Sequence, residues 1–313
     1  MSESLDPQVR ALLAQFEGKP PLHVLPVDVA RRGFNATTTS MIPPGPPVRS
    51  EDRTIDGPGG SLPLRIYRPA AEAAARPLVV YFHGGGWVVG DLDTHDPVCR
   101  ALCAGAEAVV VSVDYRLAPE HRFPAAPDDC EAATRWAIAH AASLGADPSR
   151  AVLAGDSAGG NLATVVALRL RDSDGPRPAG QLLLYPVTDH YDAAYGSYDT
   201  FAEGYGLTRA AMQWFWDHYL GAPADASLSA HAAPMRASDL RGLPPALVLT
   251  AGHDVLRDEG EVYAQRLRAA GVDAVLDRHG PMHHGFFSWC GVLDGADRAV
   301  AQACGWIVER TRR

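Results

Sequence analysis

Short apolar runs recur along most of the chain, separated by segments with helical periodicity. Continuous apolar runs of this length are typical of strands that a sheet buries on both faces. They predict strands at 78–82, 109–113, 152–154, 182–185, 246–250 and 274–276, and the alternating apolar residues Leu62, Leu64 and Ile66 predict another at 62–66. The segments between them predict helices at 96–106, 124–143, 157–171, 257–270 and 293–309. Strands that alternate with helices indicate an α/β fold, with a mostly parallel central sheet and helices on both faces.

A serine lies at the junction between one predicted strand and the helix that follows it. Residues 155–160 read GDSAGG, which contains the pattern G-x-S-x-G. Between a strand and a helix, this pattern indicates a nucleophile elbow. Small residues on either side of Ser157 allow a strained turn and close packing of the helix on the strand, which leaves the amide of Ala158 free to donate. An ordinary turn whose serine caps the helix is the alternative interpretation.

Three consecutive glycines follow an earlier predicted strand. Residues 83–87 read HGGGW, and glycines leave their backbone N–H groups uncovered by side chains. Such fixed donors can stabilise an oxyanion. A flexible turn is one alternative, and a dinucleotide-binding loop is another. The second fits less well because Gly84, Gly86 and Gly90 give G-x-G-x-x-x-G, in which the third spacing differs from the nucleotide motif.

A serine nucleophile needs a base, and the base needs an acid that orients it. Asp254 follows the predicted strand 246–250 and is our candidate acid. Asp258 and Glu259 are also acidic, but they open the next helix. There, a preference for negative charge in the first helical turn is a sufficient explanation.

Three histidines follow the last predicted strand, at positions 279, 283 and 284. We choose His284 as the base, because Gly285 and the pair Phe286-Phe287 give it a tight turn with an apolar floor. His283 is the reserve candidate. The chain order serine, acid, histidine is the order found in hydrolases that use a nucleophile elbow.

Together, these motifs resemble the hormone-sensitive-lipase-like carboxylesterases, the GDXG branch of the α/β-hydrolases, in their bacterial form. The match runs from about residue 60 to the C-terminus and includes five segments: HGGGW at 83–87, DYRLAPEH at 114–121, GDSAGG at 155–160, DVLRDEG at 254–260 and HGF at 284–286. The resemblance implies the α/β-hydrolase fold. It also implies hydrolysis of carboxylic esters with short to medium acyl chains, without a metal or organic cofactor.

The resemblance also assigns roles to individual residues. It implies Ser157 as nucleophile, His284 as base and Asp254 as orienting acid. It implies backbone oxyanion donors at Gly85, Gly86 and Ala158. Amide hydrolysis or a lyase step on the same triad remains an alternative, as does a small-molecule-binding protein without catalysis.

Two stretches outside the α/β alternation predict a helical cap. Residues 1–17 have helical spacing, and Asp6-Pro7 supplies an N-cap and first-turn proline; a second short helix is expected after Pro26. The stretch 188–225 is rich in aromatic residues. It is either an extra helix on the core or, as we favour, part of a roof over an apolar acyl pocket. The cap is then 1–45 and 188–225, and the core is 46–187 and 226–313. Candidate substrate-binding residues are Trp87, Tyr205, Leu207, Trp214, Phe215 and Phe286.

Two further features are expected to be structural. The loop 114–120 carries a pair, Arg116 and Glu120, with Pro119 fixing a turn, and lies beneath the site. Asp156, beside the nucleophile, is expected to anchor the elbow through hydrogen bonds.

Composition narrows the class of protein. A net charge of −9 argues against nucleic-acid binding. The five cysteines are odd in number and scattered, which favours buried thiols in a reducing compartment. No signal peptide is visible, and no apolar run reaches the roughly 18–20 residues of a membrane span. We therefore expect a cytoplasmic protein that acts on a small-molecule ester, without a metal site, as a monomer or a homodimer.

Overall fold

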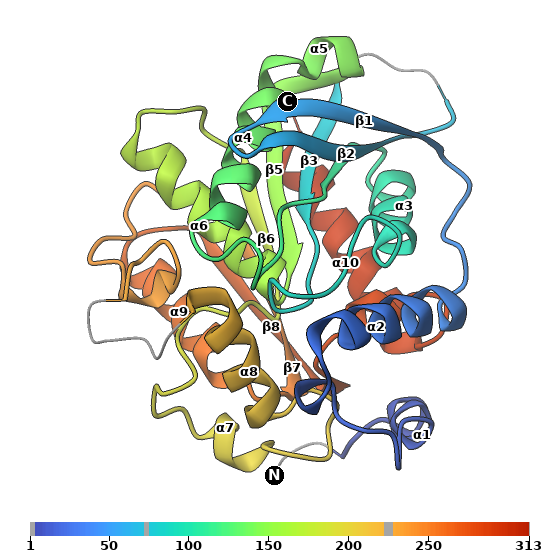
Figure 1. Ribbon diagram of the computed structural model, residues 1–313. Helices are drawn as coiled ribbons and strands as arrows, with labels where there is room; N and C mark the ends of the chain where they lie inside the picture. The colour runs from blue at the N-terminus through green and yellow to red at the C-terminus, as the bar shows by residue number, and fades with distance from the viewer. Residues whose placement is uncertain (1–3, 72–74, 222–227, 313) are drawn as a thin grey trace.

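The computed structural model describes residues 4–71, 75–221 and 228–312. Within these residues, eight strands form one sheet in the order β1-β2-β4-β3-β5-β6-β7-β8 (Figure 1). The strands are β1 (Arg49–Gly57), β2 (Gly60–Arg68), β3 (Arg76–Phe82), β4 (Val109–Val113), β5 (Ala146–Asp156), β6 (Gly180–Leu184), β7 (Ala246–His253) and β8 (Ala274–His283). The pairs β1–β2 and β2–β4 are antiparallel, and the other pairs are parallel. The predicted, mostly parallel sheet is confirmed.

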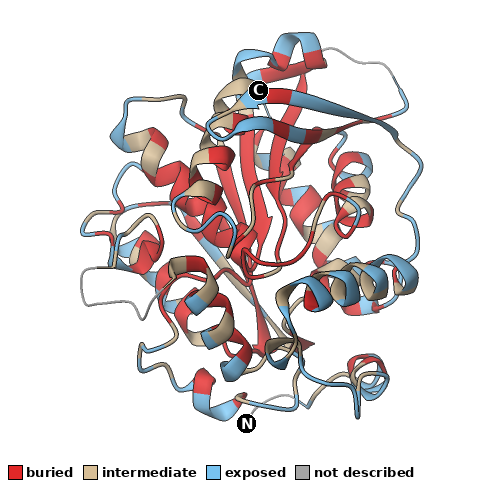
Figure 2. Ribbon diagram, in the orientation of Figure 1, coloured by how far each residue is buried: buried red, intermediate tan, exposed pale blue. Residues whose placement is uncertain are grey.

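One strand of this sheet was not predicted. β1 buries only Ile55 and forms the exposed edge of the sheet, as Figure 2 shows. An edge strand of this kind carries charged residues on both faces, which also discourages pairing with another chain. A search for apolar runs therefore passes over it.

Helices cover both faces of the sheet, as predicted. Val79 and Tyr81 of β3 face one apolar cluster, and Val80 and Phe82 face the other, because successive side chains of a strand point to opposite faces. The first cluster includes residues of α3 (Asp96–Gly105) and α10 (Asp294–Arg310). The second includes residues of α4 (Ala125–Ala139), α5 (Ala141–Leu144), α6 (Ala158–Asp172) and α9 (Arg257–Ala269).

The N-terminal residues and the stretch after β6 form further helices at one end of the sheet (Figure 1). The first group is α1 (Pro7–Ala14), η1 (Leu22–Val24) and α2 (Val27–Met41), and the second is α7 (Ser197–Thr200) and α8 (Arg209–Leu220). Asp6 caps α1 by accepting from the Gln8 N–H at 2.7 Å, as predicted. The helix after Pro26 has 15 residues and is longer than expected.

The two groups meet, because α8 contacts η1. The expected boundary at 225/226 lies outside the described residues. Two single turns, η2 (Pro234–Arg236) and η3 (Phe286–Trp289), complete the elements. None of the helices in the described part of the chain is long and apolar enough to cross a membrane.

Candidate active site

Ser157 alone forms the turn between β5 and α6. Its backbone has φ 56° and ψ −117°, in a region that residues with side chains rarely adopt. Three hydrogen bonds hold this conformation: the Ser157 N–H donates to the Leu184 carbonyl at 2.8 Å, and the Ser157 carbonyl accepts from the N–H groups of Asn161 and Val187, at 3.0 and 3.2 Å. The strained turn lifts the serine side chain out of the line of the strand, as the elbow motif predicts.

The glycines of the elbow are required by close packing. A Cβ atom at Gly159 would lie 1.9 Å from the Phe82 carbonyl oxygen, and one at Gly155 would lie 2.3 Å from the Gly159 carbonyl oxygen. No side chain can be accommodated at such distances between backbones. The helix can therefore approach the strand only because both positions are glycine.

The predicted nucleophile, base and acid lie together in one chain of hydrogen bonds. His284 Nε2 is 3.0 Å from Ser157 Oγ, and His284 Nδ1 is 2.7 Å from Asp254 Oδ2. Asp254 is only 1% exposed, whereas Ser157 keeps 7% of its surface open. This arrangement can move a proton from the serine to the imidazole while the carboxylate holds the ring.

The three residues meet because they follow strands of the same parallel part of the sheet, in which β6 lies between β5 and β7. Ser157 follows β5, Asp254 follows β7 and His284 follows β8, and the carboxyl ends of parallel strands share one edge of the sheet. Gly285 adopts φ 79° and turns the chain after the histidine. The ring of Tyr185 meets that of His284 edge-on at 4.8 Å, which provides an apolar floor.

The reserve histidine lies elsewhere. His283 is buried, and its ring approaches Gly206, where an added Cβ would lie 3.3 Å from its Cδ2. Burial and the neighbouring His284 and His253 lower the pKa of His283 to about 3, so its ring is neutral at neutral pH. His279 lies 3.2 Å from Gln302. Of the three histidines, His284 is the one bonded to the serine.

The glycine loop presents backbone donors. The Val88 and Val89 N–H groups both donate to the Gly85 carbonyl, at 3.0 and 2.9 Å, which closes a tight turn. Gly85 and Gly86 adopt φ values of 111° and 58°. Among the described residues, no hydrogen bond uses the N–H of either glycine. Ala158 opens α6, so its N–H belongs to the helical turn that lacks carbonyl partners within the helix.

Asp156 joins the glycine loop to the elbow. Its Oδ1 accepts from the Gly84 N–H at 2.9 Å and from the Tyr81 hydroxyl at 2.8 Å, and it lies 3.3 Å from His95 Nε2. Burial would raise the pKa of Asp156, but His95 and the Tyr81 hydroxyl outweigh that effect and lower it. The expected anchor of the elbow is confirmed, and its link to the loop is an addition.

Comparisons with known proteins agree with this architecture. A family model described as the alpha/beta hydrolase fold matches residues 79–288. The carboxylic ester hydrolase LipN of Mycobacterium tuberculosis is 45% identical, over 91% of this chain and 77% of that protein. The ethyl acetate hydrolase of Pseudomonas putida is 37% identical, over 95% of this chain and 96% of that protein. A hyperthermophilic esterase from the archaeon Pyrobaculum calidifontis has a TM-score of 0.94 at 41% identity, over 98% and 99% of the two chains.

The chain belongs to the hormone-sensitive-lipase-like branch of the α/β-hydrolases. It is a carboxylic ester hydrolase of the serine type. The fold and the enzyme class predicted from the sequence are therefore confirmed.

The six candidate substrate-binding residues of this esterase fall into two groups. Phe215 of α8 lies directly over the glycine loop, since a Cβ at Gly86 would be 2.2 Å from its ring. Trp214 packs edge-on against Phe215 at 5.2 Å, Tyr205 lies 5.2 Å from the ring of His253, and Leu207 is half-buried. These four come from the stretch predicted to roof the site.

Trp87 and Phe286 are completely buried and present no surface to a substrate. Trp87 stacks on Tyr219 of α8 with 4.1 Å between ring centroids. Phe286 packs against Tyr185 at 5.7 Å within the apolar cluster of α3 and α10. Both residues belong to the apolar clusters, and sequence motifs alone did not distinguish packing from lining.

The ion pair expected between Arg116 and Glu120 is wrong. Arg116 pairs with Asp129 at 2.8 Å, and Glu120 pairs with Arg31 of α2 at 2.6 Å. Arg31 also donates to the carbonyls of Val88, close to the glycine loop, and Ala118, each at 2.6 Å. The partner of Glu120 is 89 residues away in the chain, so no local pattern could identify it.

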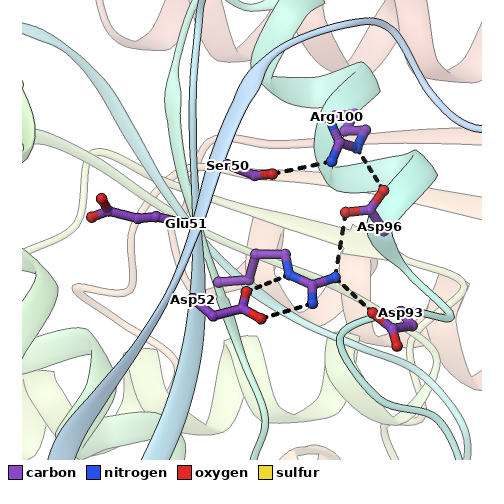
Figure 3. A pocket seen from close by; sticks show the side chains of 7 residues that line it. Ser50, Glu51, Asp52, Asp93, Asp96 and Arg100 are labelled. Carbon is purple, nitrogen blue, oxygen red and sulfur yellow. Dashed lines mark hydrogen bonds and ion pairs between the residues drawn. The ribbon is translucent and has the colours of Figure 1, made fainter.

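A charged hollow lies away from the triad, between the β1–β2 hairpin and α3 (Figure 3). Arg65 of β2, which lines it, pairs with Asp52 at 2.6 Å and with Asp93 at 2.7 Å. Asp96 of α3 pairs in turn with Arg100. These ion pairs hold the exposed hairpin against the helix.

Proposed function

We propose that this esterase uses Ser157 as its nucleophile, His284 as general base and Asp254 as the acid that orients the imidazole. The observation that supports the proposal most directly is the pair of hydrogen bonds that links the three side chains, at 3.0 and 2.7 Å. Their order along the bond chain is the order that nucleophilic acyl transfer requires.

The reaction proceeds in two steps through an acyl-enzyme. His284 takes the proton from Ser157 as the serine oxygen attacks the ester carbonyl. The N–H groups of Gly85, Gly86 and Ala158 bind the oxyanion that develops. His284 then protonates the departing alcohol. Water, activated by the same imidazole, attacks the acyl carbonyl, and the acid and free enzyme are released. Asp254 stabilises the imidazolium during both steps.

The proposed substrates are esters of short to medium acyl chains. Residues 1–45 and 188–225 form the cap in this proposal, and Phe215 over Gly86 supports it, because an aromatic ring borders the place where the carbonyl would bind. The similarity to an ethyl acetate hydrolase supports the short end of this range. Each buried methylene should contribute about 0.8 kcal/mol until the pocket is full.

We extend the proposal to a cytoplasmic location. The five cysteines are all free and buried. Burial raises the pKa of Cys290 to about 11, so its thiol stays protonated and unreactive. Free thiols of this kind are typical of proteins kept in a reducing compartment.

A labelling and substrate panel tests the proposed mechanism. A fluorophosphonate should add one covalent mass to the peptide that contains Ser157. Nitrophenyl esters of increasing acyl length should be hydrolysed with an optimum at roughly four to eight carbons, and nitroanilides much more slowly. Labelling at another serine would overturn the nucleophile, and faster turnover of the anilides would make the enzyme an amidase instead.

A further inference from the structure

The first turn of α9 begins on the candidate catalytic acid itself. The Leu256 N–H donates to Asp254 Oδ1 at 2.9 Å, and the Arg257 N–H donates to the Asp254 carbonyl at 3.2 Å. The residues of this turn are therefore tied to Asp254 by hydrogen bonds, and their contacts act on its position. Its contacts reach the stretch 188–221, called the insert below.

Asp258 holds the part of the insert that starts α7. Its Oδ2 accepts from the Ser197 N–H at 2.8 Å. The Ser197 hydroxyl donates in turn to the Val255 carbonyl at 2.6 Å. Ser197 is completely buried, so its N–H and hydroxyl depend on these protein partners.

Glu259 holds the point where the insert leaves the core. Its Oε1 accepts from the Thr188 N–H at 2.7 Å and from the Asp189 N–H at 3.2 Å. A favourable charge in a first helical turn was a sufficient explanation from sequence, but that effect needs no burial. Glu259 is 0% exposed. Burying a carboxyl is unfavourable unless it is hydrogen-bonded, and the two N–H groups of the insert are the partners of the buried Oε1.

The same turn reaches the candidate acyl pocket. The Arg257 guanidinium lies 4.8 Å from the ring centroid of Phe201, and Phe201 meets Tyr205 edge-on at 5.3 Å. Tyr205 is one of the four residues placed at the proposed roof. The turn therefore contacts the insert at its entry, at α7 and next to the pocket.

We propose that Asp258 and Glu259 are positioning residues that fix the insert, and with it the acyl pocket, relative to the acid and base of the triad. The inference rests on the proposed function, since it assumes that the insert lines the pocket. It assigns specificity to two residues that do not touch the reacting atoms. Loosening them should weaken the binding of long acyl chains while the chemical step continues.

The Asp258→Ala variant, assayed with nitrophenyl acetate and nitrophenyl hexanoate, tests the proposal. We expect KM for the hexanoate to rise about fivefold to tenfold, the equivalent of the lost hydrogen bond to the Ser197 N–H. The other partner of Asp258, Arg257 Nε at 2.8 Å, lies within the same turn. KM for the acetate should stay within about twofold, because a two-carbon chain does not reach the insert, and kcat should change little for both esters. Glu261→Ala is the matched control, because Glu261 lies on the same helix and pairs with Arg278 of β8 instead. It should leave the hexanoate-to-acetate ratio unchanged.

Substitutions at Glu259 provide a second, independent measurement. Glu259→Gln keeps an oxygen that can accept from the Thr188 N–H and should retain the wild-type ratio. Glu259→Leu removes the oxygen that accepts both bonds and should raise KM for the hexanoate selectively. If the leucine variant does not fold, the Asp258→Ala result decides.

An equal rise of KM for both esters, or no change in Asp258→Ala, would overturn the proposal. Fluorophosphonate labelling of each variant separates the two hypotheses. If a variant is still labelled on Ser157 but its hexanoate-to-acetate ratio is unchanged, the positioning role is wrong and the proposed triad is unaffected. Failure of the wild-type enzyme to take label on Ser157 counts against the proposed triad.

Discussion

The α6 helix behind the nucleophile and the α2 helix of the proposed cap have the same length and opposite environments. Of the 15 residues of α6, 12 are buried; of the 15 residues of α2, only Ala30 is buried. Packing against the sheet therefore fixes α6, and with it the turn at Ser157. The position of α2 depends instead on a few directed contacts, above all those of Arg31.

This difference indicates how the enzyme divides its tasks. The residues proposed for chemistry stand at the ends of buried strands, where close packing allows little movement. The α2 helix of the proposed cap buries only Ala30, and elements with few buried contacts open and shift at lower free-energy cost. Changes in the core should therefore abolish the reaction, whereas changes in the cap contacts should alter which esters react best.

Removal of the nucleophile should have the largest effect. Ser157→Ala should fold normally, because alanine meets the same backbone strain as serine. Its esterase activity should fall by at least about 10⁴-fold, by analogy with other serine hydrolases. His284→Ala should match it, and His283→Ala should retain activity. Steady-state hydrolysis of nitrophenyl butyrate measures all three, and substantial activity in Ser157→Ala would refute the assignment.

Substitution of the acid should have the next largest effect. Asp254→Asn keeps the shape of the side chain but favours the wrong imidazole tautomer, and the corresponding change in a serine protease costs about 10⁴-fold in turnover. We expect a loss of at least about 100-fold in kcat here. Asp258→Asn should leave kcat nearly unchanged. If these two variants exchanged their effects, the acid would be Asp258.

Sequence reasoning succeeded where function is encoded locally. The elbow and the glycine loop need glycine for reasons that lie within a few residues, such as the 1.9 Å approach at Gly159. Each strand of the core carries its own apolar run, so its position could be predicted. The chain order of the catalytic candidates then followed from the order of the strands.

Sequence reasoning failed where a residue acts through a distant partner. Arg31 meets Glu120 across 89 positions, and Glu259 meets Thr188 across 71. An arginine on an exposed helix or a glutamate in a first helical turn has an ordinary local explanation. Only the folded chain shows which carbonyl or N–H group lies opposite. β1 was not predicted for a different reason: a charged edge strand has no apolar pattern.

Loss of Arg31 should have a moderate effect, confined to the cap. Arg31→Ala leaves the carbonyls of Val88 and Ala118 without this donor, which should cost about 1–3 kcal/mol of stability. The ion pair with Glu120 adds little, because it is partly exposed. The preference for longer acyl chains should flatten.

Arg32→Ala is the matched control for Arg31→Ala. Arg32 is the next residue, and it pairs on the surface with Asp28, where both side chains are about two-thirds exposed or more. Its loss should change neither the melting temperature nor the acyl-length profile. Equal behaviour of the two variants would mean that α2 is held by general packing and not by Arg31.

The smallest expected effect on activity belongs to Glu259→Gln, which should instead change how stability depends on pH. Burial raises the pKa of Glu259 well above its ordinary value of 4.5, outweighing the two backbone N–H groups that lower it. Above pH 4.5 the unfolded chain has lost this proton while the folded chain still holds it. The unfolded state then binds fewer protons, so this group makes stability fall as pH rises toward its folded pKa. Glutamine cannot titrate, and Glu259→Gln should remove that loss.

Thermal unfolding of the wild type and Glu259→Gln at pH 5 and pH 8 measures this contribution. Between pH 5 and pH 8, the free energy of unfolding of the variant should increase relative to that of the wild type. The increase should be about 1.4 kcal/mol for each unit by which the fold raises the pKa of Glu259 within that range. In a protein of this size, each kcal/mol corresponds to a shift of about 2 °C in melting temperature. Glu261→Gln, on the same helix, controls for the loss of one carboxylate. If the stability difference between the variant and the wild type were the same at both pH values, or changed in the opposite direction, Glu259 would be ionised in the folded protein. It would then hold the insert as a charged acceptor, and glutamine would be a poorer substitute than we expect.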